Sequence, residues 1–328
     1  MRRREFIGLL TVIAVCPQTV LGQTAKKRPV VAWLGWGLKD SPLNVRYLNQ
    51  FLTGMRELGY VEGRDFEMVS RYADFHAERL PELAAELVQL NPDIILGGAT
   101  IQALAFKQAT EKIPIVGVAL ADPELFGFAA NDARPSGNVT GITPYLKGLP
   151  AKQLELAREV VPRATRIGLL DDVTDPKARP QRKEIEAAGL ALEIKIIPAE
   201  VRTSADIGTA YETFSASGVE VVVVEQSNML ISARSQIAEL AAARMLPTVY
   251  GYREHVEAGG LISYGVNLDW CFHRAAYYVD KLLKGAKPSE LPLEFPTGLQ
   301  MVINLKTAKA LKIDVSPAFL DRADEVIE

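Results

Sequence analysis

The chain has 328 residues, of which 48% are hydrophobic and 23% charged, and this composition excludes disordered and collagen-like proteins. Its length indicates two domains, and 37 basic against 40 acidic residues give a net charge of -3, which argues against nucleic acid as a partner. Two cysteines and three histidines are too few for a disulfide framework or a Cys/His metal site, so we expect no metal and no cofactor.

The N-terminal segment has the features of an export signal. Residues 2–4 are arginine, and the apolar stretch at residues 7–15 is too short to span a bilayer as a helix. We therefore predict a signal peptide over residues 1–22, removed after Gly22, and a periplasmic location for the mature protein.

The export route and a lipid anchor stay open at this point. Residues 3–7 fit a twin-arginine motif, but basic residues before an apolar stretch suit general secretion as well. Cys16 is a candidate for lipidation, yet Val15 before it is larger than that signal requires, so we favour cleavage without lipidation. Cys271 then has no partner, and we expect it to be a buried small hydrophobic residue.

From residue 29 onward, apolar strands alternate with amphipathic helices, which predicts an α/β protein with parallel sheets. The expected elements of the first half are strand 30–34, helix 43–58, strand 66–71, helix 77–90, strand 93–96, helix 101–109 and strand 115–119. The second half repeats the order with strand 166–170, helix 182–188 ended by Gly189, strand 192–197, helix 204–216, strand 219–224 and a strand after Pro247. Matching elements lie about 130 residues apart, which predicts two similar lobes in tandem.

The boundary between the lobes is expected in a region of Pro and Gly residues that ends near residue 150. The first lobe is predicted over residues 29–144 plus about 265–295, and the second over residues 145–264 plus about 296–328. A helix over residues 270–283 would return the chain to the first lobe. The chain would then cross between the lobes more than once and form a hinge.

Short motifs spread over nearly the whole chain resemble the ABC transporter substrate-binding family, in particular the periplasmic group that includes tryptophan and phenylalanine binders. The motifs are RRREFI (2–7), ELGYVEGR (57–64), AERL (77–80), NPDII (91–95), IPIV (113–116), ADP (121–123), GNVTG (137–141), EAGGL (257–261), SYG (263–265), KGAKP (284–288) and NLKTAKAL (304–311). The resemblance implies two Rossmann-like lobes with the type I periplasmic binding protein fold. It also implies closure, like a Venus flytrap, around a small ligand that is delivered to a permease and ATPase.

Ligands of open parallel sheets bind at the carboxyl ends of the strands, so the loops after strands are candidate contacts. Gly98, Ala99 and Thr100 join a strand to a helix, where close backbone approach and the helix N-terminus favour a carboxylate. The resemblance implies that Ala99 and Thr100 meet the anionic end of the ligand. In the alternative interpretation, Thr100 only caps the helix.

Polar residues follow other strands at equivalent places. Asp122 either accepts a hydrogen bond from a ligand ammonium group or caps a short helix that begins at Pro123. In the second lobe, Gln226, Ser227 and Asn228 follow a strand, and ligand contact and helix capping are both open for them.

Aromatic residues near strand ends are candidates for stacking on a flat ligand, and Thr143 at the predicted lobe boundary is a further candidate contact. The aromatic candidates are Trp36, Tyr145, Tyr250 and Tyr264.

Two loops differ from the family pattern. Residues 171–176 (DDVTDP) replace an Asn-Pro-type loop, and Glu225–Gln226 replaces a more common Pro-Asp pair. Asp171 is the candidate contact of the first loop, where negative charge disfavours an anion and tolerates an amine. The ligand is therefore not transferred from the aromatic amino acid binders. We expect an amino acid or another small carboxylate, including aromatic ones.

The sequence carries no G-x-x-x-x-G-K-[ST] run and no G-x-S-x-G motif, and its histidines are far apart, so we expect no enzyme activity. The preferred hypothesis is a monomeric solute-binding protein whose partners are the ligand, a permease and an ATPase. The alternative is a ligand-sensing module that signals through a separate receptor.

Overall fold

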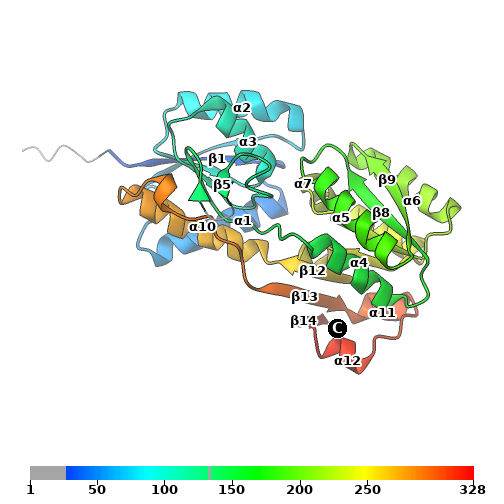
Figure 1. The fold of residues 1–328 in the computed structure, drawn as a ribbon. Coiled ribbons are helices and arrows are strands. Elements are labelled where there is room, and N and C mark those ends of the chain that lie inside the picture. The colour runs from blue at the N-terminus through cyan, green and yellow to red at the C-terminus, as the bar shows by residue number, and fades with distance from the viewer. Residues whose placement is uncertain (1–26, 132–133) are drawn as a thin grey trace, which may run out of the picture.

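Two separate sheets, one in each half of the chain, form the framework of the protein (Figure 1). The computed structural model describes residues 27–131 and 134–328, so the predicted signal peptide and Cys16 lie outside the described residues. The first lobe is the five-stranded sheet with the helices packed on it, and the second lobe is the seven-stranded sheet with its helices.

The first lobe contains a fully parallel sheet in the order β2-β1-β3-β4-β7. Its strands are β1 (Val30–Gly35), β2 (Glu67–Tyr72), β3 (Ile94–Gly97), β4 (Ile115–Gly117) and β7 (Val139–Gly141), and its helices are α1 (Pro42–Glu57), η1 (Ala77–Arg79), α2 (Leu80–Gln89), α3 (Thr100–Ala109) and α10 (Leu268–Leu283). A small antiparallel ribbon, β5 (Ala129–Asn131) with β6 (Arg134–Pro135), lies beside them.

Alternation along β1 explains the two covered faces of this sheet. Val31 and Trp33 pack with α1 and α10 on one face, whereas Ala32 and Leu34 pack with α2 and α3 on the other. Cys271 on α10 is fully buried, which confirms its expected role as a small hydrophobic residue.

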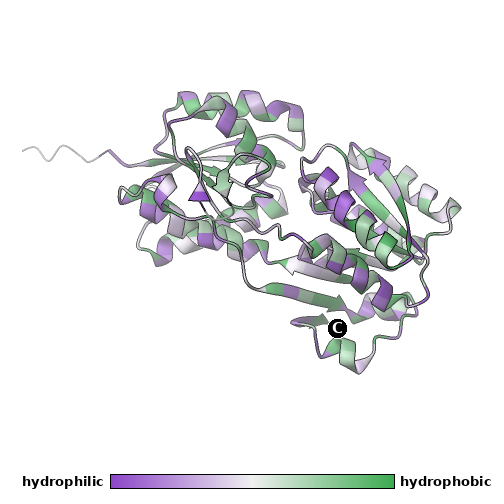
Figure 2. Cartoon of the chain, in the orientation of Figure 1, coloured by the Kyte–Doolittle hydropathy of each residue, from purple (hydrophilic) through white to green (hydrophobic). Residues whose placement is uncertain are grey.

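The second lobe has the order β14-β13-β12-β11-β10-β8-β9, parallel except between β12 and β13. Its strands are β8 (Arg166–Asp172), β9 (Lys195–Val201), β10 (Val221–Val224), β11 (Thr248–Tyr250), β12 (Ile262–Val266), β13 (Leu299–Asn304) and β14 (Glu325–Ile327). Its helices are α4 (Leu149–Val160), α5 (Ala178–Ala191), η2 (Ser204–Asp206), α6 (Ile207–Ala216), α7 (Asn228–Ser232), α8 (Arg234–Ala243), α9 (Arg253–Glu257), α11 (Leu305–Ala310) and α12 (Pro317–Leu320). Figure 2 shows apolar strands enclosed by helices with hydrophilic positions.

One predicted helix end is wrong. The helix expected to stop at Gly189 continues through it, because α5 extends to Ala191. A Cβ atom on Gly189 would lie 2.7 Å from Cγ1 of Ile196, so this glycine permits close packing of helix against strand.

The chain passes between the lobes three times: after β7, between β12 and α10, and between η3 (Pro288–Glu290) and β13. The crossing segments lie side by side, because the Thr143 N–H donates to Glu294 O at 2.8 Å and Val266 pairs with Leu299. The fold class expected from the sequence, two Rossmann-like lobes with a multi-crossing hinge, is confirmed.

Each lobe has a close backbone contact between two glycines next to the hinge. A Cβ atom on Gly141 would lie 2.0 Å from the carbonyl oxygen of Gly117, and a Cβ atom on Gly265 would lie 2.0 Å from that of Gly251. We call these the two glycine–carbonyl contacts. Within the described ranges, no helix has the length and apolarity that a membrane crossing requires.

Candidate functional site

A cavity of about 280 Å³ lies between the lobes, beside the loops that follow the carboxyl ends of the strands. The first lobe lines it with Trp33, Leu34, Trp36, Gly37, Ser41, Pro42, Leu43, Asn44, Tyr47, Phe75, Gly98, Ala99, Gln102, Ala119, Leu268 and Phe272, and the second lobe with Lys177, Asn228, Ile231, Ser232, Arg234, Ser235 and Tyr252. We call it the interlobe cavity. Its volume suits one small molecule.

Aromatic side chains form much of the wall. The rings of Tyr47 and Phe272 stack with centroids 4.5 Å apart, and Trp33, Trp36 and Tyr252 complete the set with Phe75 at the rim. The indole nitrogens of both tryptophans are buried without a hydrogen-bond partner among the described residues. The cavity therefore presents flat apolar surfaces, and the unpaired indole N–H groups are buried within its walls.

Phe75 reaches the rim through an unusual backbone conformation. Both Asp74 and Phe75 have positive φ angles, 53° and 67°, which bulky residues rarely adopt. The Phe75 N–H donates to Trp36 O at 3.0 Å, and the Arg79 guanidinium pairs with Asp74, so two contacts hold the turn. The Phe75 side chain is left 45% exposed beside Gly37.

Two cationic side chains line the interlobe cavity. Lys177 Nζ lies 2.8 Å and 2.9 Å from the two carboxylate oxygens of Asp175, and the side chains are only 7% and 5% exposed. Arg234, at the start of α8, donates from Nη1 to Ile231 O at 3.3 Å and contacts no carboxylate among the described residues.

Polar contacts join the lobes around the cavity. Asn228 Nδ2 donates to Gln102 Oε1 at 3.3 Å, directly across it. Arg46 on α1 pairs at 2.6 Å with Asp269 and also at 2.6 Å with Glu257 of α9. The contact with Asp269, and then that with Glu257, raises the pKa of the guanidinium against the opposing effect of burial.

A buried contact lies next to that ion pair. The Tyr47 hydroxyl donates to Glu254 Oε1 at 3.0 Å, and burial raises the pKa of both side chains. The described conformation is therefore held by contacts between the lobes as well as by the hinge.

Four of the residues expected to bind ligand line the interlobe cavity: Trp36, Gly98, Ala99 and Asn228. Thr100 does not, because its hydroxyl accepts a hydrogen bond from the Ala121 N–H at 2.9 Å and ties α3 to the loop after β4. The N-cap position of α3 is Ala99, so the capping role considered for Thr100 is wrong.

Three further candidates lie in the crossing region of the first lobe. Asp122 Oδ1 accepts a hydrogen bond from the Leu125 N–H at 3.1 Å, which matches the local-capping alternative. Thr143 donates to Leu120 O at 3.1 Å within the core, and the Tyr145 hydroxyl donates to Glu184 at 2.9 Å. Asp122 and Tyr145 line a separate pocket of about 160 Å³.

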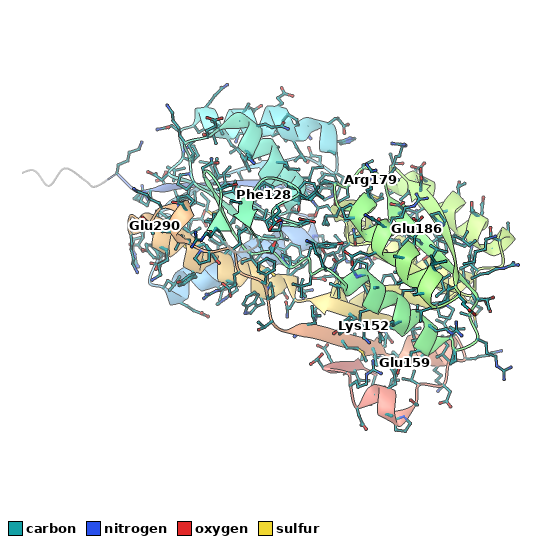
Figure 3. The ribbon with its side chains drawn as sticks, in the orientation of Figure 1. Phe128, Lys152, Glu159, Arg179, Glu186 and Glu290 are labelled. Atoms are coloured by element: carbon teal, nitrogen blue, oxygen red, sulfur yellow. The ribbon has the colours of Figure 1, made fainter. Side chains whose placement is uncertain are left out.

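In the second lobe, Asp171 pairs with Arg182 at 3.2 Å and borders a more open cavity on the side of α5, where Figure 3 shows Arg179 and Glu186. The main-chain N–H of Gln226 donates to Gln181 Oε1, and the main-chain carbonyl of Gln226 accepts a hydrogen bond from Gln181 Nε2. None of these residues lines the interlobe cavity.

Ser227 caps α7 by accepting a hydrogen bond from the Leu230 N–H at 3.0 Å. Tyr250 is fully buried and stacks on His255, and Tyr264 packs half-buried against the core of the second lobe. These side chains support the fold near the site and do not line the interlobe cavity.

Sequence reasoning missed most of the aromatic and charged lining. Lys177 and Tyr252 occupy loops that follow strands, so the rule that selected Trp36 could have found them. The helical residues Tyr47, Arg234 and Phe272 carry no such signal. Among the residues that the structure describes, no cluster of three or more His, Cys, Asp or Glu side chains is placed to hold a metal ion.

Glu225 is buried beside Asp171, and neither of its carboxylate oxygens has a hydrogen-bond partner within the described chain. Burial, followed by the charge of Asp171, raises the pKa of Glu225 well above its usual value. The folded state therefore retains a proton that the unfolded state releases, and this group makes folding less favourable as the pH rises from the unfolded pKa toward the folded one.

We expect Glu225→Gln to raise the free energy of unfolding at pH 8 by about 1–2 kcal/mol, because the amide needs no proton. The gain should shrink toward pH 5, and urea unfolding of both proteins at the two pH values measures it. Glu220→Gln, which removes an exposed carboxylate that accepts main-chain hydrogen bonds, is the control and should not stabilise the protein. An equal or larger gain at pH 5 would contradict the assigned protonation of Glu225.

Comparisons with known proteins agree with this architecture. The chain is 23% identical over 261 residues, 80% of its length and 75% of the relative's, to the tyrosine-binding protein of Clostridioides difficile strain R20291. The crystal structure of a conserved domain protein from Vibrio cholerae matches with a TM-score of 0.85 and 27% identity, covering 92% of this chain and 100% of that one. An ABC domain from Streptococcus pneumonia in complex with L-Trp matches with a TM-score of 0.84 and 23% identity, again covering 92% and 100%.

The sequence also matches a family profile over residues 44–327, and the description of that family is ABC transporter substrate binding protein. The match spans both lobes and every crossing of the hinge. Members of this family are solute-binding proteins and not enzymes. The sequence, in agreement, lacks the catalytic motifs considered above. The chain belongs to the ABC transporter substrate-binding protein family.

Proposed function

We propose that the protein is the periplasmic, monomeric solute-binding component of an ABC importer and that it carries a small aromatic carboxylate to a permease. The observation that carries the proposal is the interlobe cavity, whose aromatic walls come from both lobes and whose Arg234 has no carboxylate partner among the described residues. The similarity to proteins named for tyrosine binding and solved with L-Trp supports an aromatic ligand.

The geometry also supports ligand-driven closure. Trp36 and Gly98 belong to the first lobe, whereas Asn228 and Arg234 belong to the second. A ligand that contacts both sets gains its full interaction energy only when the lobes are closed, so binding shifts the population toward the closed state. A permease can then distinguish loaded from empty protein.

A thermal-shift screen tests the ligand class. The protein is unfolded, washed, refolded and screened against amino acids, aromatic acids, sugars and nucleosides. A ligand present at about 100 times its Kd stabilises the folded state by about 2.7 kcal/mol, which gives a clear shift in Tm. We expect the hits among aromatic amino acids or aromatic acids, and hits only among sugars or nucleosides would contradict the proposal.

Two tryptophan variants test the site. Trp36→Ala removes an aromatic wall and should weaken binding of the hit by about tenfold or more, measured by calorimetry. Trp270→Ala is the matched control, because Trp270 is 39% exposed on α10 and does not line the interlobe cavity. Equal affinities of the two variants would place the ligand elsewhere.

Delivery to a permease needs a cellular test. Deletion of the gene should abolish uptake of the labelled hit, and expression of the wild-type chain should restore it, whereas Trp36→Ala should restore less at limiting concentrations. Normal uptake in the deletion strain, together with tight binding in vitro, would point to a sensing role.

A further inference from the structure

The charges on the wall of the interlobe cavity are all of one sign. Among the described residues that line it, Lys177 and Arg234 are cationic and none is acidic. Lys177 is already neutralised, because its ammonium group contacts both carboxylate oxygens of Asp175. Arg234 makes only a main-chain contact and leaves a positive charge uncompensated.

Two carboxylates that contact lining residues are already engaged by those residues. Both oxygens of Asp175 face Lys177, and Glu254 lies behind Tyr47, from whose hydroxyl it accepts a hydrogen bond. Asp122, considered above as a partner for a ligand ammonium group, borders a different pocket. An ammonium group in the interlobe cavity would therefore meet no carboxylate side chain among the described lining residues.

The donors of the cavity favour an anion instead. Gly98 has no Cβ atom, so its main chain lies open at the cavity wall, beside the buried indole nitrogen of Trp33. Gly98 and Ala99 also open α3, a helix of ten residues whose N-terminus adds unpaired main-chain N–H groups. The main-chain N–H groups at this helix end and the Arg234 guanidinium both favour a carboxylate over an ammonium group.

We infer that the ligand is an aromatic monocarboxylate without an α-ammonium group, such as an arylacetate, an arylpropionate or an aryl 2-oxo acid. This inference rests on the proposed function and narrows its substrate class. The aromatic ring occupies the wall formed by Trp36, Tyr47 and Phe272, and the carboxylate pairs with Arg234. The first lobe then holds the ring and adds the main-chain N–H groups that precede α3, and the second lobe supplies Arg234.

The experiment compares ligands that differ in one group. Calorimetry with refolded, ligand-free protein measures indole-3-propionate against L-tryptophan, 3-phenylpropionate against L-phenylalanine, and each acid against its primary amide. We expect each acid to bind at least about tenfold more tightly than its amino acid and its amide, because an unpaired buried ammonium group and an unused arginine are both unfavourable.

Variants separate the role of Arg234 from a general loss of charge. Arg234→Gln should weaken binding of the acids by about tenfold or more and leave amide binding within about twofold, and Arg234→Lys should recover part of the loss. Arg202→Gln is the matched control, because Arg202 is exposed and outside the cavity lining. It should bind the acids like the wild-type protein.

Each contrary outcome has its own meaning. If the amino acids bind as tightly as the acids or more tightly, the inference is overturned while the proposed function stands. If acids, amides and amino acids all fail to bind, the proposed function falls and the inference falls with it. If the acids bind but Arg234→Gln has no effect, the pairing with Arg234 is overturned.

Discussion

Replacing Gly141 with alanine is expected to lower the free energy of unfolding by about 3–5 kcal/mol. The new Cβ atom would lie 2.0 Å from the carbonyl oxygen of Gly117 and 2.8 Å from its carbonyl carbon and its nitrogen. These are main-chain atoms of the neighbouring parallel strand, so no side-chain rotation relieves the overlap. The φ angle of Gly141, 136°, adds backbone strain for any residue with a Cβ atom.

Urea unfolding followed by circular dichroism measures this effect, and Gly208→Ala is the matched control. Gly208 lies in α6, where an added Cβ atom meets nothing within 4 Å. Alanine there should be neutral or stabilise the protein by up to about 1 kcal/mol, because it favours the helical conformation. If both variants unfold at the same urea concentration, the close contact between Gly141 and Gly117 does not control stability.

Acidification from pH 8 to pH 5 is expected to lower the free energy of unfolding by about 2 kcal/mol through His255 alone. Burial lowers the pKa of His255 from 6.5 to about 4, against the opposing effect of the main-chain groups of Tyr252 and Leu230, and the charge of Arg234 lowers it further. The ring stacks on Tyr250 with centroids 4.6 Å apart, and neither of its nitrogens has a well-formed hydrogen bond to a described residue.

The sign follows from where the proton binds. The unfolded chain takes up a proton below its pKa of about 6.5, whereas the folded protein stays neutral until about pH 4. The stabilising effect of the neutral ring is therefore complete above pH 6.5, and it is lost as the pH falls through this window toward 4, with a maximum of about 3 kcal/mol.

Urea unfolding between pH 4.5 and 8 of wild-type protein, His255→Phe and His273→Gln tests this. The phenyl ring preserves an aromatic contact with Tyr250 and cannot be protonated. Between pH 8 and pH 5, the free energy of unfolding of His255→Phe should therefore fall by about 2 kcal/mol less than that of the wild-type protein. His273 is partly exposed and lies 2.9 Å from Glu57, and its replacement should leave the His255 contribution unchanged. A pH dependence of His255→Phe equal to that of the wild type would refute the assignment.

The sequence predicted most of the fold because local patterns determine it. The run of valines in β10 is continuous since both faces of that strand are covered, and helix periodicity located α1 and α10 to within a few residues. The end of α5 was missed because Gly189 is also a helix-stopping signal. Its role depends on Ile196, a contact that exists only after the helix packs on its strand.

The candidate site was predictable only in part. Trp36, Gly98 and Asn228 follow strands and line the interlobe cavity. They are selected by the rule that ligands of open parallel sheets bind beside the carboxyl ends of the strands. The same rule selected Tyr250, but alternation along β11 directs that side chain into the core of the second lobe. Tyr47 and Arg234 reach the cavity from helices, and their positions depend on how the lobes pack together.

The two glycine–carbonyl contacts also have a consequence for where we expect the chain to bend. Each holds a strand that leads into a crossing against its neighbour at main-chain distance, so we expect these strands to keep their register during closure of the lobes. We expect bending at short connectors outside the contacts, at residues 144–148, 267 and 295–298, which belong to no strand or helix. We therefore expect that each lobe can be exchanged as a unit at these three connectors. A chimera joined there would combine the ligand contacts of two parent proteins without altering either sheet.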